Sequence, residues 1–289
     1  MPNWAYTNVT VKGTKKSIHD VIKLGLVNSG VAESEIPADL RKAFDLFLKE
    51  GKTKTADTKG DDYATREVIG IKMENGITMQ TFFPMPDSYI LYDTTNKPNS
   101  APESVLAEQE KLGAIGWYDY NLRYLGTKWN AELEGIDLNE SVNPDEDWAT
   151  ITFKTETAWS MPDRFFSRLT EAAPVIVIAE GTEESNAYFC VVVFADGEGW
   201  SYADFSEEFS KKCDDFNNKR DELEKKLKAE GKSDEEIEKT LDDEIGEYVE
   251  DIDIFEKLDL AYEKAVELFM PDSDFENMGF EPETETETE

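Results

Sequence analysis

The run Pro174-Val175-Ile176-Val177-Ile178 and the run from Tyr188 to Phe194 decide the fold class of this 289-residue chain. Both are short, continuously apolar and rich in β-branched residues, which is typical of buried strands. Pro162 comes just before Phe165 and Leu169, and proline is favoured in the first turn of a helix. A helix followed by two buried strands predicts a sheet with helices packed on it.

The residues upstream continue this mixture of strands and helices. Asn8 to Lys12 alternates apolar and polar residues and stops at Gly13, as a half-buried strand does. Helical spacing predicts one helix after Ser17 and a second from Pro37 to Gly51. The other expected elements are a polar loop over 52–62, a hairpin of 68–73 and 78–83 around Glu74-Asn75-Gly76, a helix over 103–112 and a strand over 148–155. We therefore expect residues 1–200 to form an α+β domain.

The pattern beyond residue 200 is helical. Phe205, Phe209, Phe216, Leu223 and Leu227 are spaced as a heptad seam, and Ser233 to Glu236 is a capping box that opens a second apolar stripe. We expect residues 201–271 to form an acidic helical hairpin that turns at Gly231. The tail over 272–289 has few apolar residues and is expected to be disordered.

All of the excess charge lies outside the first hundred residues. Residues 1–100 hold 13 Lys/Arg and 13 Asp/Glu, whereas residues 101–289 hold 17 and 51, so 17 − 51 = −34 is the net charge of the whole chain. Such a surface repels nucleic acid and anionic lipid, and it attracts basic protein surfaces. There is no basic leader and no apolar run that could cross a bilayer, so we expect a cytoplasmic protein with reduced cysteines and a protein partner.

Two stretches carry the most distinctive acidic pattern. Residues 240–256 hold eight acids and no Lys or Arg, and Asp243, Glu247 and Glu250 share one helix face. Residues 132–147 form the second stretch. The candidate protein-binding residues are Asp243, Glu247, Glu250, Asp251, Asp253, Glu256, Glu132, Glu134, Asp137, Asp145 and Glu146. The alternative is that both stretches are only solvated surface, which is what most charge runs are.

Several aromatic motifs lie in the first 200 residues. They are Met1-Pro2-Asn3-Trp4, Phe83-Pro84-Met85-Pro86, Trp117-Tyr118, Gly126-Thr127-Lys128-Trp129-Asn130 and Thr157-Ala158-Trp159-Ser160-Met161-Pro162. In this order they resemble the YubB-type ferredoxin-like family of phage and plasmid proteins. The resemblance implies a ferredoxin-like antiparallel sheet with helices and a place on a mobile genetic element. It brings no established catalytic residues. The sequence differs from the family pattern at Ala5, Leu125 and Met161.

Catalytic motifs are sparse. His19 is the only histidine and is expected to be a surface or half-buried residue, and no Cys/His spacing fits zinc. Asp196-Gly197-Glu198-Gly199 lacks the lysine of a phosphate loop and reads as a turn. Lys128 could contact an anionic ligand or stack on aromatic rings, although we favour a core role for the tryptophans around it. We expect no enzyme activity, no metal and no cofactor.

These observations lead to two main hypotheses. The first is a phage- or plasmid-encoded acidic inhibitor that binds a host antiphage defence complex, such as a restriction, CRISPR or Gabija-type nuclease. Its carboxylates would take the place of DNA phosphates and block DNA access. The alternative is a non-enzymatic accessory protein of a mobile element that self-assembles as a scaffold through the helical hairpin. An enzyme built around Lys128 is the third and least favoured hypothesis.

Overall fold

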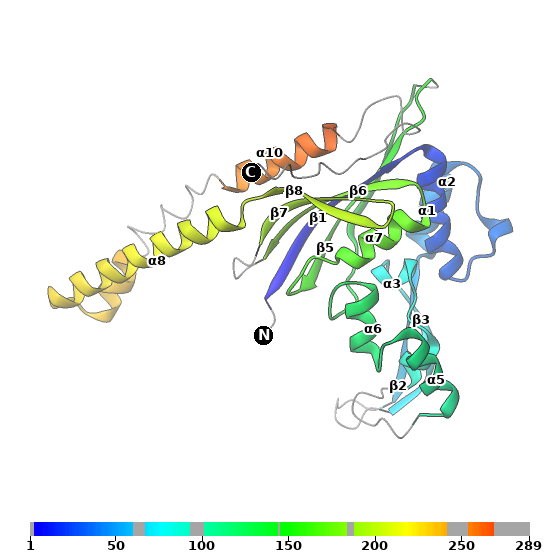
Figure 1. The fold of residues 1–289 in the computed structure, drawn as a ribbon, viewed down its shortest axis with the longest axis horizontal. Coiled ribbons are helices and arrows are strands. Elements are labelled where there is room, and N and C mark those ends of the chain that lie inside the picture. The colour runs from blue at the N-terminus through cyan, green and yellow to red at the C-terminus, as the bar shows by residue number, and fades with distance from the viewer. Residues whose placement is uncertain are drawn as a thin grey trace, which may run out of the picture.

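The computed structural model describes residues 3–59, 67–92, 101–143, 145–183, 188–241 and 254–268. Its centre is an antiparallel sheet of six strands in the order β4-β5-β1-β6-β7-β8 (Figure 1). In chain order these strands are β1 (Trp4–Gly13), β4 (Glu134–Glu140), β5 (Ala149–Ala158), β6 (Val175–Glu183), β7 (Phe189–Ala195) and β8 (Glu198–Asp204). The expected α+β class with an antiparallel sheet is confirmed.

Strand β1 is paired along most of its length with β5 on one side and β6 on the other. Its alternating sequence gives the sheet two different faces. Val9 and Val11 point into the main apolar core, whereas Asn8 and Thr10 lie on the opposite face. Because directly paired residues share a face, this alternation sets which residues of β5 and β6 are apolar or polar.

Helices α1 (Lys15–Asn28) and α7 (Asp163–Ala172) cover the apolar face of the sheet (Figure 1). Phe165 is completely buried, and its ring lies 5.9 Å from Phe82, 5.9 Å from Phe83 and 5.6 Å from Phe166. Helix α2 (Leu40–Glu50), preceded by a short 3₁₀ helix η1 (Glu33–Glu35), packs on α1. The predicted helices in these regions are therefore present.

Residues between α2 and β4 form a second layer below the main sheet (Figure 1). Its elements are β2 (Lys52–Lys59), β3 (Glu67–Asn75), α3 (Met79–Phe82), α4 (Asp87–Leu91), α5 (Glu103–Leu112) and α6 (Trp117–Tyr124). The predicted loop over 52–62 is wrong for residues 52–59, because β2 pairs with β3. Strand β2 alternates Lys and Thr, so it has no apolar period by which it could be recognised.

The predicted hairpin of 68–73 with 78–83 is also wrong. The first run does form part of β3, but Thr78 starts the short helix α3 with a capping box that it shares with Thr81. Thr53 of β2 is buried and its hydroxyl lies 2.7 Å from Thr78 Oγ1 and 2.9 Å from Thr81 Oγ1. These hydroxyl contacts join β2 to the start of α3. Strand β3 therefore pairs with β2, which precedes it in the chain, and not with residues 78–83.

The two-residue turn between β7 and β8 is built by Asp196 and Gly197. Their φ angles are 49° and 83°, both in the left-handed region that this kind of hairpin turn requires. The interpretation of residues 196–199 as a turn is confirmed for Asp196 and Gly197, whereas Glu198 and Gly199 already belong to β8. The strand that follows the turn, β8, was not predicted, and the predicted domain boundary at residue 200 falls inside it.

The C-terminal helices divide between the sheet and a projecting arm. Helix α8 (Ser206–Ala229) extends away from the sheet (Figure 1). Leu223 and Leu227 form an apolar cluster with Ile237 and Leu241, beyond the turn at Gly231. The predicted capping box is present: Ser233 N donates to Glu236 Oε2, and Glu236 N donates to Ser233 Oγ.

Helix α10 (Ile254–Leu268) lies on the face of the sheet opposite α7 (Figure 1). Leu258 and Ala265 are fully buried in one apolar cluster with Ile178 and Phe209. The apolar side of residues 254–268 therefore packs on the sheet. The sequence pattern had predicted that these residues form part of the second arm of a helical hairpin. Among the described residues, no helix is long and apolar enough to cross a membrane.

We expect Phe165→Ala to destabilise the protein by about 3–5 kcal/mol, because it removes a completely buried ring that packs against three others. Urea denaturation followed by circular dichroism measures this change. Ile115→Ala is the matched control, since Ile115 is 68% exposed and its truncation should have little effect. Equal effects of the two substitutions would contradict this core.

Candidate functional site

A polar groove lies on the face of the sheet that α10 partly covers. It has a volume of about 620 Å³ and opens beside β1, β5 and β6. Its lining residues are Asn8, Val9, Thr10, Glu134, Gly135, Thr152, Phe153, Lys154, Glu180, Asp259, Tyr262 and Glu263. The groove therefore brings the first predicted acidic stretch, through Glu134, next to the C-terminal helical region.

Strand pairing places the charged residues of this groove in one row. Glu134 of β4 is opposite Lys154 of β5, Lys154 is opposite Asn8, and Asn8 is opposite Glu180 of β6. Asn8 Nδ2 donates to Glu180 Oε1 at 3.2 Å. The groove then holds four carboxylates, counting Asp259 and Glu263 from α10, against one lysine. Such a surface favours cationic groups.

Glu180 is the most perturbed carboxylate of the groove. It is 7% exposed, and burial, followed by repulsion from Asp259, raises its pKa above the ordinary value of 4.5. The Asn8 amide and the Lys154 ammonium act in the opposite direction. Because burial dominates, the ionised form of Glu180 is disfavoured in the folded protein.

Tyr262 fixes α10 over the groove. Its hydroxyl lies 2.7 Å from Thr10 Oγ1, and burial raises its pKa to about 12. This contact joins the helix to β1, the central strand, across a sequence separation of 252 residues. The position of Asp259 and Glu263 at the groove therefore depends on a buried hydrogen bond as well as on Leu258 and Ala265.

The predicted acidic residues near β4 lie at an edge of the sheet. Glu132, Glu134, Asp137 and Asp145 are exposed, and β4 has no partner on its outer side in the described sheet. Glu146 has a structural role instead. Its carboxylate accepts hydrogen bonds from Ser141, Asn143 and Trp148 in the loop between β4 and β5, and these bonds lower its pKa.

The second predicted stretch lies mostly outside the described residues. This holds for Asp243, Glu247, Glu250, Asp251 and Asp253. Glu256 is described and is exposed in the first turn of α10. Negative charge at this position interacts favourably with the helix dipole.

The sequence analysis did not identify Asn8, Lys154, Glu180 or Tyr262 as site residues. The one signal in the sequence was the alternation in β1, which places a polar residue such as Asn8 on the face opposite the apolar core.

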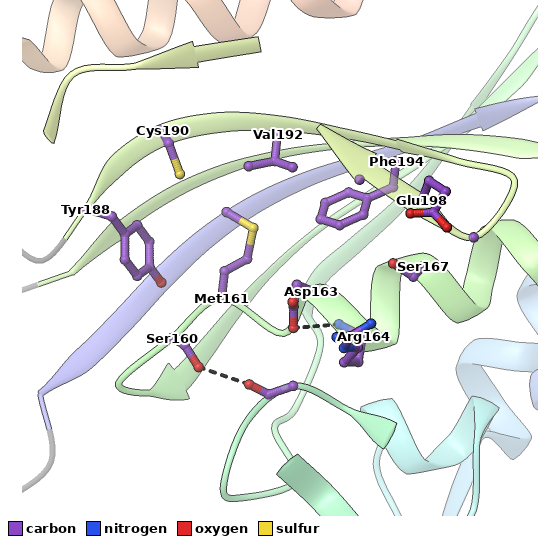
Figure 2. A pocket seen from close by; sticks show the side chains of 13 residues that line it. Ser160, Met161, Asp163, Arg164, Ser167, Tyr188, Cys190, Val192, Phe194 and Glu198 are labelled. Carbon is purple, nitrogen blue, oxygen red and sulfur yellow. Dashed lines mark hydrogen bonds between the residues drawn. The ribbon is translucent and has the colours of Figure 1, made fainter. Parts of the chain in front are cut away.

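A second groove, of about 550 Å³, lies on the α7 face of the sheet. Figure 2 shows Cys190, Val192 and Phe194 of β7 along one wall, with Asp163, Arg164 and Ser167 of α7 facing them. Burial raises the pKa of the Cys190 thiol to about 12 and also raises that of Tyr188. Cys190 is therefore a neutral thiol at physiological pH, which is not its nucleophilic form.

The other sequence candidates for chemistry have structural contacts. His19 is half-buried, as expected, and its Nε2 lies 2.7 Å from the Pro37 carbonyl oxygen. Within the described ranges, no three His, Cys, Asp or Glu side chains gather as a metal site would require.

The tryptophans around Lys128 differ from the expected core. Trp129 is 36% and Trp159 is 44% exposed, and their near-parallel rings are 6.1 Å apart. Trp159 also has a φ of 66°, which for a bulky residue costs about 1–3 kcal/mol. The favoured interpretation that these rings fill the core is wrong at both positions, because the backbone directs them to the surface.

Glu180 predicts an unusual pH dependence of stability. Because its folded pKa is raised, its contribution to stability is complete below about pH 4.5 and is lost as the pH rises through the folded value. Glu180→Gln should therefore be more stable than the wild type at pH 7, with a difference in Tm that shrinks toward pH 4.5.

Thermal melts of both proteins between pH 4.5 and 8 measure this difference. Glu146→Gln is the matched control with the opposite sign: the lowered pKa of Glu146 predicts a loss of stability that persists across this whole pH range, because it would disappear only below about pH 4.5. A difference between Glu180→Gln and the wild type that does not change with pH would contradict the proposed environment of Glu180.

Comparison with known proteins finds one weak structural match. No protein family matches the sequence, and no curated protein does. One solved structure, a protein api92 from Yersinia pseudotuberculosis described by the family model DUF1281, is similar over 70% of this chain and 99% of its own. The identity is 11% and the TM-score is 0.29, so the likeness is weak and supports no inference about function.

Proposed function

We propose that this protein is a non-enzymatic binding protein whose acidic face occupies a basic surface on another protein. The observation that carries this proposal is the groove in which Glu134, Glu180, Asp259 and Glu263 surround Lys154. These carboxylates come from β4, β6 and α10, and the sheet register and the Tyr262 contact hold them in place. A preformed acidic surface loses little conformational entropy when a cationic partner binds.

The state of Glu180 explains why a cation would be favoured there. In the free protein Glu180 is buried beside Asp259, so like charges face each other in a partly dry groove. An arginine or lysine side chain of a partner would offset this repulsion and return the pKa of Glu180 toward its ordinary value. A bound cation would therefore favour the ionised form of Glu180.

We further propose that the protein comes from a phage or plasmid and acts in the cytoplasm of the bacterial host as an inhibitor of an antiphage defence complex. A nuclease complex of the restriction, CRISPR or Gabija type has a basic DNA-binding surface of the kind this groove would fit. The acid-rich residues 242–253 come directly before α10 in the sequence and would extend the same charge.

The fold is compatible with a YubB-type ferredoxin-like assignment, which we include in the proposal. Strands β1, β4, β5 and β6 occur in the spatial order β4-β5-β1-β6, with α1 after β1 and α7 between β5 and β6. With the elements from η1 to α6 set aside as an insertion, this order resembles the β-α-β-β-α-β order of a ferredoxin-like sheet extended by β7 and β8, and it supports the proposal.

The test is capture of partners from a bacterial lysate by the wild type and by a triple variant with Glu134→Gln, Asp259→Asn and Glu263→Gln. We expect a nucleic-acid-handling complex that the wild type retains at about 50 mM salt and releases at about 300 mM. The triple variant should fail to retain it, and duplex DNA should compete with the wild type for it.

A matched control removes the same number of carboxylates from the exposed face of α8, through Asp214→Asn, Asp215→Asn and Glu222→Gln. This control should retain the partner, because its groove is intact. A partner that both triple variants lose equally would show that only net charge matters. Retention that is indifferent to salt would overturn charge mimicry.

A self-assembling scaffold is the second candidate, and the projection of α8 favours it. Helix α8 projects from the sheet (Figure 1), and Leu223 and Leu227 near its end pack against Ile237 and Leu241, which follow the turn at Gly231. Heptad-spaced apolar residues on a projecting helix are a common means of association between copies.

Light scattering of the intact protein over a range of concentrations tests this candidate. Self-association through the arm predicts an average mass that rises with concentration and falls when Leu223 is changed to Asp. Truncation at residue 200 is unsuitable, because it would remove most of β8 together with Phe209 and Leu258, which pack on the sheet. A constant monomer mass would exclude the scaffold.

A further inference from the structure

Two loops that carry separate sequence motifs meet at one end of the sheet. Thr127 Oγ1 donates to the carbonyl oxygen of Ala158. Ser160 Oγ donates to the carbonyl oxygen of Gly126 (Figure 2). The backbone N–H of Trp159 donates to the Asn3 carbonyl oxygen. Residues 126–130 and 157–160 therefore form one surface together with the start of β1, although they are far apart in the sequence.

The loop over 126–130 is held rigidly from below. Asn121 Nδ2 donates to the Lys128 carbonyl oxygen, and Asn130 bonds both to the backbone N–H of Gln80 and to the Thr78 hydroxyl. With the backbone fixed by these contacts, the side chains of Lys128 and Trp129 form the outer surface of the loop. A rigid loop of this kind is suited to binding, because its side chains are positioned in advance.

The ammonium group of Lys128 lies among aromatic rings. It is 4.7 Å from the centroid of Trp129, 4.9 Å from that of Trp159 and 5.7 Å from that of Tyr118. Among the described residues no carboxylate lies within ion-pair distance of it. The rings hold the cation in place while leaving its N–H groups able to donate to an anion.

The charge of this region differs from that of the rest of the molecule. Residues 117–130 and 157–168 together contain Arg123, Lys128, Arg164 and Arg168 against Asp119 and Asp163, so 4 − 2 = +2. The chain as a whole carries −34. The two segments that carry the exposed tryptophans therefore have a small positive balance, although the adjoining groove also holds the acidic Asp163 and Glu198.

The same loops border the groove on the α7 face. Gly126, Ser160 and Arg164 line this groove of about 550 Å³, which is within the size range of small-molecule sites. It shares no lining residue with the acidic groove on the opposite face. Flat aromatic surface, an anchored cation and an adjoining groove thus occur in one place.

We propose that this surface binds a nucleoside phosphate. The base stacks on the exposed indole of Trp159, the phosphate accepts hydrogen bonds from Lys128, and the ribose points into the groove beside Ser160 and Arg164. Stacking on an aromatic ring tolerates any base, because each has a π face. A small ligand fits better than a long nucleic acid, because the acidic remainder of the chain repels a polymer.

The experiment titrates the intact protein with adenosine monophosphate and follows tryptophan fluorescence and binding heat. Adenosine and inorganic phosphate are titrated separately. We expect the nucleotide to bind at least about tenfold more tightly than either part alone, since stacking and charge contribute together. Lys128→Gln should reduce nucleotide binding to about the level of adenosine.

Trp159→Gly separates binding from folding. Glycine adopts a φ of 66° without strain, so this variant should keep a Tm within about 3 °C of the wild type. Loss of the ring should weaken nucleotide binding about tenfold or more. Trp148→Phe is the matched control: Trp148 also has a lysine, Lys12, over its ring at 5.3 Å, but Lys12 is buried, and binding should stay within about twofold.

Four results would overturn the proposal. They are the absence of saturable binding up to about 10 mM nucleotide, unchanged binding by Trp159→Gly, inorganic phosphate that binds as tightly as the nucleotide, and a short single-stranded oligonucleotide that binds more than about tenfold more tightly. The last result would assign the surface to nucleic acid. Each outcome is independent of the acidic groove, which the nucleotide does not touch.

Discussion

The central position of β1 constrains the rest of this structure. Strand β1 is paired on both sides, so each of its residues fixes the face of a residue in β5 and another in β6. Val9 and Val11 require an apolar layer, which α1 and α7 supply. Asn8 and Thr10 require polar partners on the opposite face, and Glu180 and Tyr262 supply them. A shift of one residue in register would exchange the two faces and bury Asn8 in the apolar core.

This constraint also separates the two candidate surfaces. The acidic groove forms where the polar half of β1 meets α10, and the aromatic surface forms where loops at the end of β5 and β1 meet on the other side. Between them lies an apolar core that includes Val177 and Phe165. The acidic groove and the ring-bound cation of Lys128 therefore lie in different places, which a net charge of −34 does not reveal.

Local signals in the sequence predicted most of the main sheet and its helices. The apolar runs at β6 and β7, the proline before α7 and the capping box at Ser233 each act within a few residues. Pairing between distant segments was not predictable in this way. Strand β2 has no apolar period, and residues 254–268 have a stripe that fits a partner helix as well as a sheet. The groove was missed for the same reason, since Glu180 lies in an apolar run and Asp259 in a helix assigned elsewhere.

The aromatic surface was misjudged for a different reason. Tryptophan is most often buried, so composition favoured a core, and nothing in the sequence marks the positive φ of Trp159. Trp159 and Glu180 share one property, because the fold holds each in a locally unfavourable arrangement. The backbone of Trp159 has a strained positive φ, and the carboxylate of Glu180 is buried next to that of Asp259. Each is also part of a surface to which a ligand could bind. Folding alone gives no reason for either residue. A glycine at position 159 would remove the backbone strain, and a glutamine at position 180 would remove the buried carboxylate. Such conflicts between local preference and fold are concentrated at functional sites, which is the physical reason why we propose a binding role for each of these two positions.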